Sequence, residues 1–286
     1  MNSRYLIELL TPKHSVEDTE AALEAFADRY GRIIEAGFVV AIPDNAMGVP
    51  RFQALEVIRE LGLPVPCGQL LLHLNAFHQP GEFSETLRAA ADLDVKNLLV
   101  VSGDGGERLH RLEPAELGLD AGAVTSVELL KHIHREFPGV FNTGAAFNSY
   151  EPQEHELPKL RRKLDEGATF IATQPVVGLD HRVFEAGEFG VPVYVGAWMS
   201  RRLDLLAKCV GRQVPDWRLY DPLHNITFLR RRYDGWGMYL SMVDFRFQFS
   251  EIQDTLAQEE AGCAFCCGCA GAEHSSPAAL LPVGSD

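Results

Sequence analysis

Two acidic residues of this sequence lie where apolar stretches are interrupted or end, and such positions can support acid–base chemistry. Glu8 lies inside the first apolar stretch, residues 5–10, and Asp104 follows the apolar stretch that begins at Asn97, between two glycines. Burial disfavours a charged carboxylate, so we expect a raised pKa for Glu8 and proton donation near neutral pH. Asp104, in a polar turn, is expected to stay ionised and to oppose developing positive charge. The alternatives are an ion pair between Glu8 and an arginine, and a turn-capping role for Asp104.

Further polar residues follow other apolar stretches and complete the candidate site. Gln174 offers one acceptor and two donors, which suits the edge of an amide-bearing heterocycle, although a backbone tie is the alternative. His73 and His78 have no third ligand at a recognisable spacing, so hydrogen-bonding histidines are favoured over a metal site. The other residues at stretch ends are Asp44 with Asn45, Asn75, Asn148 with Tyr150, Trp198 and Asp244.

A basic group lies on one predicted polar helix, residues 154–166. Lys159 and Lys163 are one turn apart on the same face, with Arg161 and Arg162 between them. The group either meets a cofactor phosphate or forms a solvated helix face.

Eight apolar stretches alternate with helix-compatible sequence, and together they would bring these polar residues to one edge. A spacing of roughly 30 residues per strand predicts a (β/α)8 barrel, an α/β fold whose site lies at the carboxyl ends of the strands. The alternative is a doubly wound open sheet, but no Gly-x-Gly-x-x-Gly follows the first strand. The predicted strands span residues 5–10, 37–42, 69–74, 97–101, 140–147, 169–173, 191–195 and 238–243. The predicted helices span residues 15–30, with Ser15 as N-cap, 52–61, 82–93, 124–137, 154–166 and 201–211.

Composition narrows the class of partner. The chain has 286 residues and a formal net charge of -14, which argues against nucleic acids and anionic membranes as partners and favours small molecules. No signal-peptide core or membrane-length apolar run is present, so we predict a cytoplasmic protein.

The cysteines predict two regions of different character. Cys67 and Cys209 are isolated, whereas Cys263, Cys266, Cys267 and Cys269 crowd into the last part of the chain. We therefore expect a barrel over residues 1–250 and a cysteine-rich tail over residues 251–286. That tail is either mobile, a zinc or iron–sulfur ligand set, or a docking element for a partner subunit. A homo-oligomer is the other expected assembly.

Several motifs together resemble the methylenetetrahydrofolate reductase family. Tyr5-Leu-Ile-Glu8 followed by Pro12 is similar to its first strand, and the stretch from Asn97 to Gly103-Asp104 resembles its strand ending in Gly-Asp. The most specific match is the basic helix ending in Asp-Glu-Gly-Ala168, followed by Ile-Ala-Thr-Gln174. Val40-Ala-Ile-Pro-Asp44-Asn45 and Leu72-His73-Leu-Asn75 are similar to the second and third strands of the family. The resemblance covers residues 5–245.

The resemblance implies reduction of 5,10-methylenetetrahydrofolate to 5-methyltetrahydrofolate in one-carbon metabolism, with hydride from NADH or NADPH passing through bound FAD. Glu8 would be the general acid, Asp104 would stabilise the iminium cation and contact the substrate, and Gln174 would bind the pterin. No metal is implied. The cofactor-binding residues would be Asp44, Asn45, His73, Gly103, Lys163 and Asp165.

The chain departs from the family at several cofactor positions. Ser102 stands where an arginine is common, and an arginine would offer up to five donors to an anionic cofactor. Pro43 replaces a threonine. Two alternatives therefore stand beside the FAD-dependent reductase: a flavin-independent methylene-pterin reductase with direct hydride transfer, and a non-redox folate-binding subunit of a methyl-transfer complex.

Overall fold

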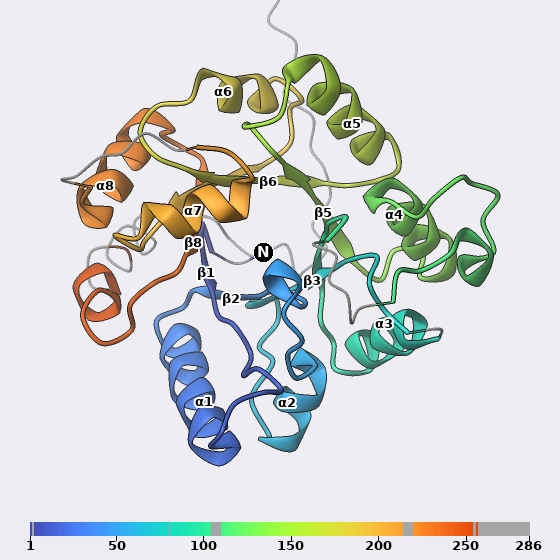
Figure 1. The fold of residues 1–286 in the computed structure, drawn as a ribbon, viewed down its shortest axis with the longest axis horizontal. Helices are drawn as coiled ribbons and strands as arrows, with labels where there is room; N and C mark the ends of the chain where they lie inside the picture. The colour runs from blue at the N-terminus through green and yellow to red at the C-terminus, as the bar shows by residue number, and fades with distance from the viewer. Residues whose placement is uncertain (2, 80, 104–109, 214–219, 254–255, 257–286) are drawn as a thin grey trace, which may run out of the picture.

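Eight parallel strands close into a barrel in the computed structural model, and each strand pairs with its neighbours in sequence order, β8 with β1 included (Figure 1). The structure describes all residues except 2, 80, 104–109, 214–219, 254–255 and 257–286. The (β/α)8 prediction is confirmed over the open-sheet alternative. The strands are β1 (Tyr5–Glu8), β2 (Val39–Ile42), β3 (Leu70–Leu74), β4 (Asn97–Val100), β5 (Asn142–Phe147), β6 (Phe170–Val176), β7 (Val193–Trp198) and β8 (Gly237–Ser241).

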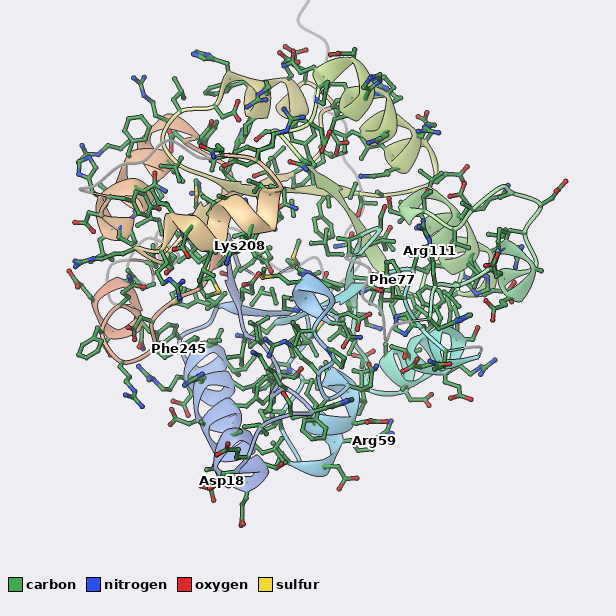
Figure 2. The ribbon with its side chains drawn as sticks, in the orientation of Figure 1. Asp18, Arg59, Phe77, Arg111, Lys208 and Phe245 are labelled. Atoms are coloured by element: carbon green, nitrogen blue, oxygen red, sulfur yellow. The ribbon has the colours of Figure 1, made fainter. Side chains whose placement is uncertain are left out.

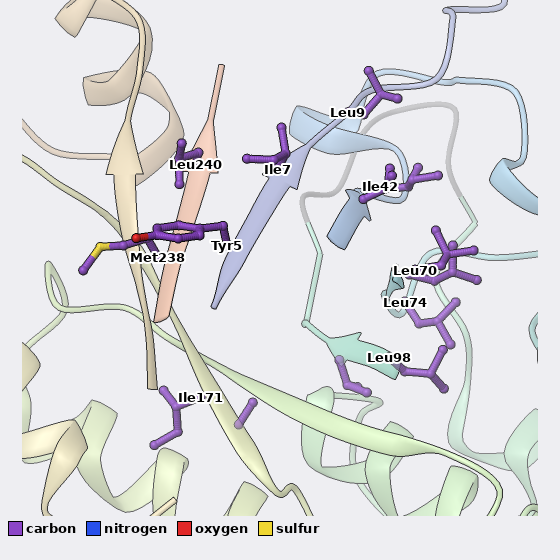
Figure 3. Packing of buried hydrophobic residues seen from close by; sticks show 14 of the residues in the cluster. Tyr5, Ile7, Leu9, Ile42, Leu70, Leu74, Leu98, Ile171, Met238 and Leu240 are labelled. Carbon is purple, nitrogen blue, oxygen red and sulfur yellow. The ribbon is translucent and has the colours of Figure 1, made fainter. Parts of the chain in front are cut away.

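The alternation of strand side chains gives the barrel two separate cores. Ile7 and Leu240 are register neighbours on β1 and β8 and belong to the large cluster between strands and helices (Figure 3). Successive side chains of a strand face opposite sides. A second cluster therefore fills the barrel interior, and it consists of Leu6, Val39, Ala41, Leu71, Leu99, Phe170, Ala172, Tyr194 and Tyr239. Gly144 belongs to this interior, because a Cβ there would lie 2.2 Å from the ring of Phe170.

The helices surround the strands (Figure 1). Asp18 accepts a hydrogen bond from the amide of Ala21 and is the N-cap of the first helix, so the prediction of Ser15 as N-cap is wrong. Both residues carry a side-chain oxygen that can accept from a helix amide, but Asp18 lies about one turn closer than Ser15 to Phe26, the first buried residue of the helix. The elements are α1 (Thr19–Glu35), η1 (Ala46–Gly48), α2 (Ala54–Glu60), α3 (Glu82–Asp92), η2 (Pro114–Leu117), α4 (Ser126–Glu136), α5 (Gln153–Asp165), α6 (His181–Gly187), α7 (Leu203–Val210) and α8 (Pro222–Arg232).

Two helices lie between β7 and β8, and they have different positions. Helix α8 packs against β7 in the outer ring, whereas α7 lies nearer the centre of the ring (Figure 1). Leu206 and Val210 of α7 form a separate apolar cluster with Trp198 and Tyr220. The sequence predicted α7 as the barrel helix after the seventh strand and missed α8, which begins at Asp221-Pro222 and has Asp221 as N-cap.

The segment after β8 packs back onto α1. Phe245 lies beside α1 (Figure 2). Phe249 stacks on Phe245 with ring centroids 5.0 Å apart, and Arg32 of α1 donates to the carbonyl of Phe245 (3.0 Å). Ile252 and Leu256 are buried as well. Cys263, Cys266, Cys267 and Cys269 lie outside the described residues. Within the described residues, no helix is long and apolar enough to span a membrane.

Candidate functional site

A cavity of about 620 Å³ lies at the carboxyl ends of the strands. Four polar side chains on its wall each lie two residues after a residue of the interior core on the same strand, so they face the same side of that strand. Glu8 follows Leu6, His73 follows Leu71, Gln174 follows Ala172, and Ser241 follows Tyr239. The period of two thus explains why side chains from distant segments meet in one cavity.

Glu8 is a partly buried carboxyl group on the floor of this cavity. The hydroxyl of Tyr239 donates to its Oε2 (3.0 Å), the hydroxyl of Ser241 lies 3.4 Å from the same atom, and the backbone amide of Met242 also donates to the carboxyl. Loss of hydration raises the pKa of Glu8 despite these hydrogen bonds. Arg51 acts on Glu8 only at a distance, and Glu8 forms no salt bridge with any residue that the structure describes. A carboxyl group with a raised pKa keeps its proton at higher pH than an exposed one, so Glu8 is suited to act as a proton donor.

Tyr239 connects Glu8 to His73. The Tyr239 hydroxyl lies 3.2 Å from Nε2 of His73, and burial lowers the pKa of His73 to about 3, so the imidazole is neutral. When Glu8 carries a proton, it can donate to Tyr239, which then donates to His73. When Glu8 is ionised, the Tyr239 hydroxyl donates to Glu8 instead. The three side chains therefore accommodate both protonation states of Glu8.

Ser102 and Gly103, the two residues before Asp104, line the cavity. Asp104 itself lies outside the described residues. Gly103 has a positive φ of 83°, and a Cβ there would lie 2.6 Å from Cβ of Asn75. Glycine is thus required at this position by backbone conformation and by space. The roles predicted for Asp104 stay predictions.

Asp44 reaches the cavity wall as part of a buried charged group. Its Oδ2 lies 2.9 Å from Nε2 of His78, and Nδ1 of His78 lies 3.7 Å from Oε2 of Glu82. Burial alone would lower the pKa of His78, but the two carboxylates outweigh burial and raise it to about 9. His78 is therefore a cation at neutral pH.

Asn45 and Asn75 hold loops and do not line the cavity. The Asn45 side chain donates to Asp44 (2.9 Å) and accepts from the amide of Arg51 (3.0 Å). The Asn75 side chain donates to the carbonyl of Asp44 (2.9 Å) and accepts from the amide of Phe77 (2.7 Å). These contacts fix the loops after β2 and β3.

Gln174 lines the cavity at an irregularity in the pairing of β6 with β7, between Ala172 and Pro175. The hydroxyl of Thr173 accepts from the amide of Gly196 (2.9 Å) there, which bridges the two strands. Trp198 also lines the cavity, and its buried indole N–H has no hydrogen-bond partner among the described residues. Gln174 therefore presents an amide group to a ligand, and the Trp198 ring adds apolar surface to the wall.

Three of the four basic residues of α5 line the cavity, and the fourth, Arg161, lies over the ring of Phe189. Lys159, Arg162 and Lys163 line the cavity, together with the acidic Glu151 and Glu156. Lys163 is buried, donates to the carbonyl of Ala146 (2.6 Å), and has a pKa lowered by burial.

Several predicted site residues lie away from the cavity or form local hydrogen bonds. Asp165 is exposed at the end of α5 and is not on the cavity wall. The Asp244 side chain accepts from the amides of Arg246 and Phe247, as a turn-capping carboxylate does. Tyr150 donates to the carbonyl of Pro175 (2.8 Å). Asn148 lines the cavity, and its side chain accepts from the amide of Tyr150.

The wall residues that sequence reasoning missed include Tyr239, Ser241, Met47 and Met242. Tyr239 and Ser241 had a signal, because they are polar residues at alternate positions of an apolar strand. Met47 and Met242 had none, since their positions depend on loop conformation. Across the described residues, no group of three or more His, Cys, Asp and Glu side chains has a metal-binding arrangement.

The closed barrel and its cavity place the chain among the (β/α)8 barrel proteins with a site at the carboxyl ends of the strands. No protein-family model matches the sequence, and no curated protein matches it. A Clostridium thermocellum protein described as binding two copies of 5-methyl-5,6,7,8-tetrahydrofolic acid has a similar structure, with a TM-score of 0.62, 13% identity, and coverage of 91% of this chain and 96% of that one. Dihydropteroate synthase from Xanthomonas albilineans with 7,8-dihydropteroate gives a TM-score of 0.50 at 15% identity, covering 91% and 94%. At these identities the similarity establishes the shared fold.

Proposed function

We propose that this chain binds a reduced folate in the cavity, with the pterin ring against the floor near Glu8 and Gln174. The observation that carries the proposal is the position of Glu8 on the cavity wall, where loss of hydration raises the pKa of its carboxyl group. A protonated carboxyl group and a carboxamide each offer donors and acceptors, as the edge of a pterin requires. Leu99 and Ala172 supply apolar surface for the ring faces. The Clostridium and Xanthomonas barrels support this proposal, since their structures are described with folate or pterin ligands.

For the reaction, we propose reduction of 5,10-methylenetetrahydrofolate to 5-methyltetrahydrofolate with hydride from NADH or NADPH. Glu8 gives its proton to the bridging nitrogen that leaves the methylene carbon, and the breaking C–N bond leaves its electron pair on that nitrogen. Hydride then adds to the carbon of the resulting iminium cation. The Tyr239 hydroxyl turns to donate to the Glu8 carboxylate that remains, which stabilises the product state.

FAD as the hydride carrier stays a prediction, because the described residues fit it only in part. Lys159 and Arg162 offer cations to a diphosphate. Asp44, however, is paired with His78, the Asn45 side chain is engaged by loop contacts, and Asp165 lies away from the cavity. The steps above use no residue that depends on flavin. A non-redox folate-binding subunit needs only the cavity, and it is the second candidate.

Calorimetric titration with 5-methyltetrahydrofolate tests the binding proposal. We expect binding by the full chain and about tenfold weaker binding by Gln174→Ala, the loss of one buried hydrogen-bonding group. Gln79→Ala, on an exposed loop, is the matched control and should bind as the parent does. Absence of binding by the parent chain at millimolar ligand would refute the proposal.

Oxidation of NADH or NADPH that depends on methylenetetrahydrofolate, assayed with and without added FAD, tests the reaction. We expect Glu8→Gln to abolish oxidation while 5-methyltetrahydrofolate still binds. Turnover retained in Glu8→Gln would remove Glu8 as the acid. Binding without any oxidation in the parent chain would support the non-redox candidate.

A further inference from the structure

Backbone strain in this protein is concentrated at the mouth of the cavity. Four non-glycine residues in the described part of the chain have left-handed backbone: Asn45 (φ 45°), Met47 (φ 58°), Asp94 (φ 57°) and Met242 (φ 63°). Asn and Asp tolerate this conformation because their short polar side chains can bond locally, whereas methionine has no such compensation. The two methionines are therefore held in an unfavourable conformation by their surroundings, and strain of this kind occurs at functional sites.

Both methionines line the cavity from different loops. Met47 lies in η1, after β2, and its sulfur lies 3.7 Å from the sulfur of Cys209 on α7. Met242 follows β8 directly, next to Ser241 and above Glu8. Both side chains are partly exposed, at 48% for Met47 and 37% for Met242, although each is a large apolar group. An apolar side chain held half-open at a cavity mouth is available to a ligand.

The chemistry of the two side chains selects the part of a ligand that they meet. A thioether side chain is flexible and polarizable and makes favourable contacts with aromatic rings. In a folate whose pterin lies on the floor and whose carboxylates point outward, the aminobenzoyl ring must cross the mouth. We propose that Met47 and Met242 form an aryl-binding rim that contacts this ring and selects pterins carrying an aryl substituent. This inference rests on the proposed function.

Three ligands separate the parts of a folate: 6-methyltetrahydropterin, tetrahydropteroate, which adds the aryl ring, and tetrahydrofolate, which adds the glutamate. The double variant Met47→Asn/Met242→Asn keeps residues that tolerate left-handed backbone but removes the thioethers. We expect about tenfold weaker binding of tetrahydropteroate and tetrahydrofolate, and 6-methyltetrahydropterin unchanged within about twofold. Met47→Leu/Met242→Leu, which keeps apolar contact, should stay within about threefold of the parent for all three.

Asp94→Asn is the matched control, because Asp94 has the same backbone conformation in the turn between α3 and β4, at the other end of the barrel. It should change no affinity. Equal loss for all three ligands in the Asn double variant would overturn the inference, since the methionines would then act through the floor. Unchanged affinities would also overturn it. If the parent chain binds none of the three ligands, the proposed function fails, which is a separate result.

Discussion

His78 should make the stability of the protein depend on pH in a window where few other groups titrate. Its imidazole is buried between Asp44 and Glu82 and packs edge-on against Phe83, with ring centroids 5.5 Å apart. Glu82 is held in turn by the side chain of Gln53 (2.9 Å) and the amide of Gln79 (2.7 Å). The perturbation is His78→Gln, which keeps hydrogen-bonding capacity and removes the titrating charge.

The magnitude follows from the two pKa values of His78. The folded protein raises that pKa to about 9, against about 6.5 in the unfolded chain, and each pKa unit is worth about 1.36 kcal/mol. Because the folded state holds the proton more tightly, this stabilisation is complete below about pH 6.5 and is lost as pH rises through about 9. The parent should therefore lose about 3 kcal/mol of unfolding free energy, relative to His78→Gln, between pH 6 and pH 10.

Urea unfolding followed by circular dichroism at five pH values measures this difference, because other titrating groups contribute equally to parent and variant. His155→Gln, at an exposed position on α5, is the control and should follow the parent at every pH. Curves for parent and His78→Gln that run parallel from pH 6 to pH 10 would refute the reasoning. The charged His78 would then contribute nothing to holding Asp44.

Three further predictions follow from the floor of the cavity. Glu8→Gln should gain thermal stability over the parent as pH rises above about 4.5, because the raised pKa means that the folded state resists ionisation of Glu8. A difference in melting temperature between variant and parent that is the same at pH 5 and pH 9 would contradict this prediction. Tyr239→Phe removes a hydrogen bond that favours ionised Glu8, so the pH profile of folate affinity should move to higher pH, at a stability cost of about 1 kcal/mol; a shift to lower pH argues against the contact. Gly196→Ala places a Cβ 2.7 Å from the backbone of Gln174, so urea unfolding should show a loss of about 1–3 kcal/mol together with weaker folate binding, and a variant of unchanged stability would be inconsistent with that packing.

The sequence was sufficient to predict the barrel because apolar residues are spaced differently in its strands and in its helices. Runs such as Val39–Ile42 are apolar on both faces, as a parallel strand covered on both sides must be. Glu8 was identifiable for the same reason. A carboxyl group inside an apolar strand is costly to bury without a partner, so it is expected to face a cavity. These are local patterns, and they need no knowledge of distant contacts.

The remaining features depend on contacts between distant segments. The charge on His78 follows from Asp44, a residue on another loop, so no local pattern indicates it. The left-handed backbone of Met47 and Met242 contradicts their residue type, and only the fold imposes it. The distinction between α7 and α8 depends on which helix packs against β7. Sequence periodicity does not contain that information.

Helix α7 has a consequence for how this protein can change. Helix α8 packs against β7 in the outer ring, so α7 is an addition to that ring. Its Cys209 meets Met47 on the cavity wall, whereas Leu206 and Val210 are buried in the cluster with Trp198. Substitutions at Cys209 can therefore change which ligands enter while the buried residues of α7 keep their packing. Cys209 is accordingly the first position to vary for a change of specificity.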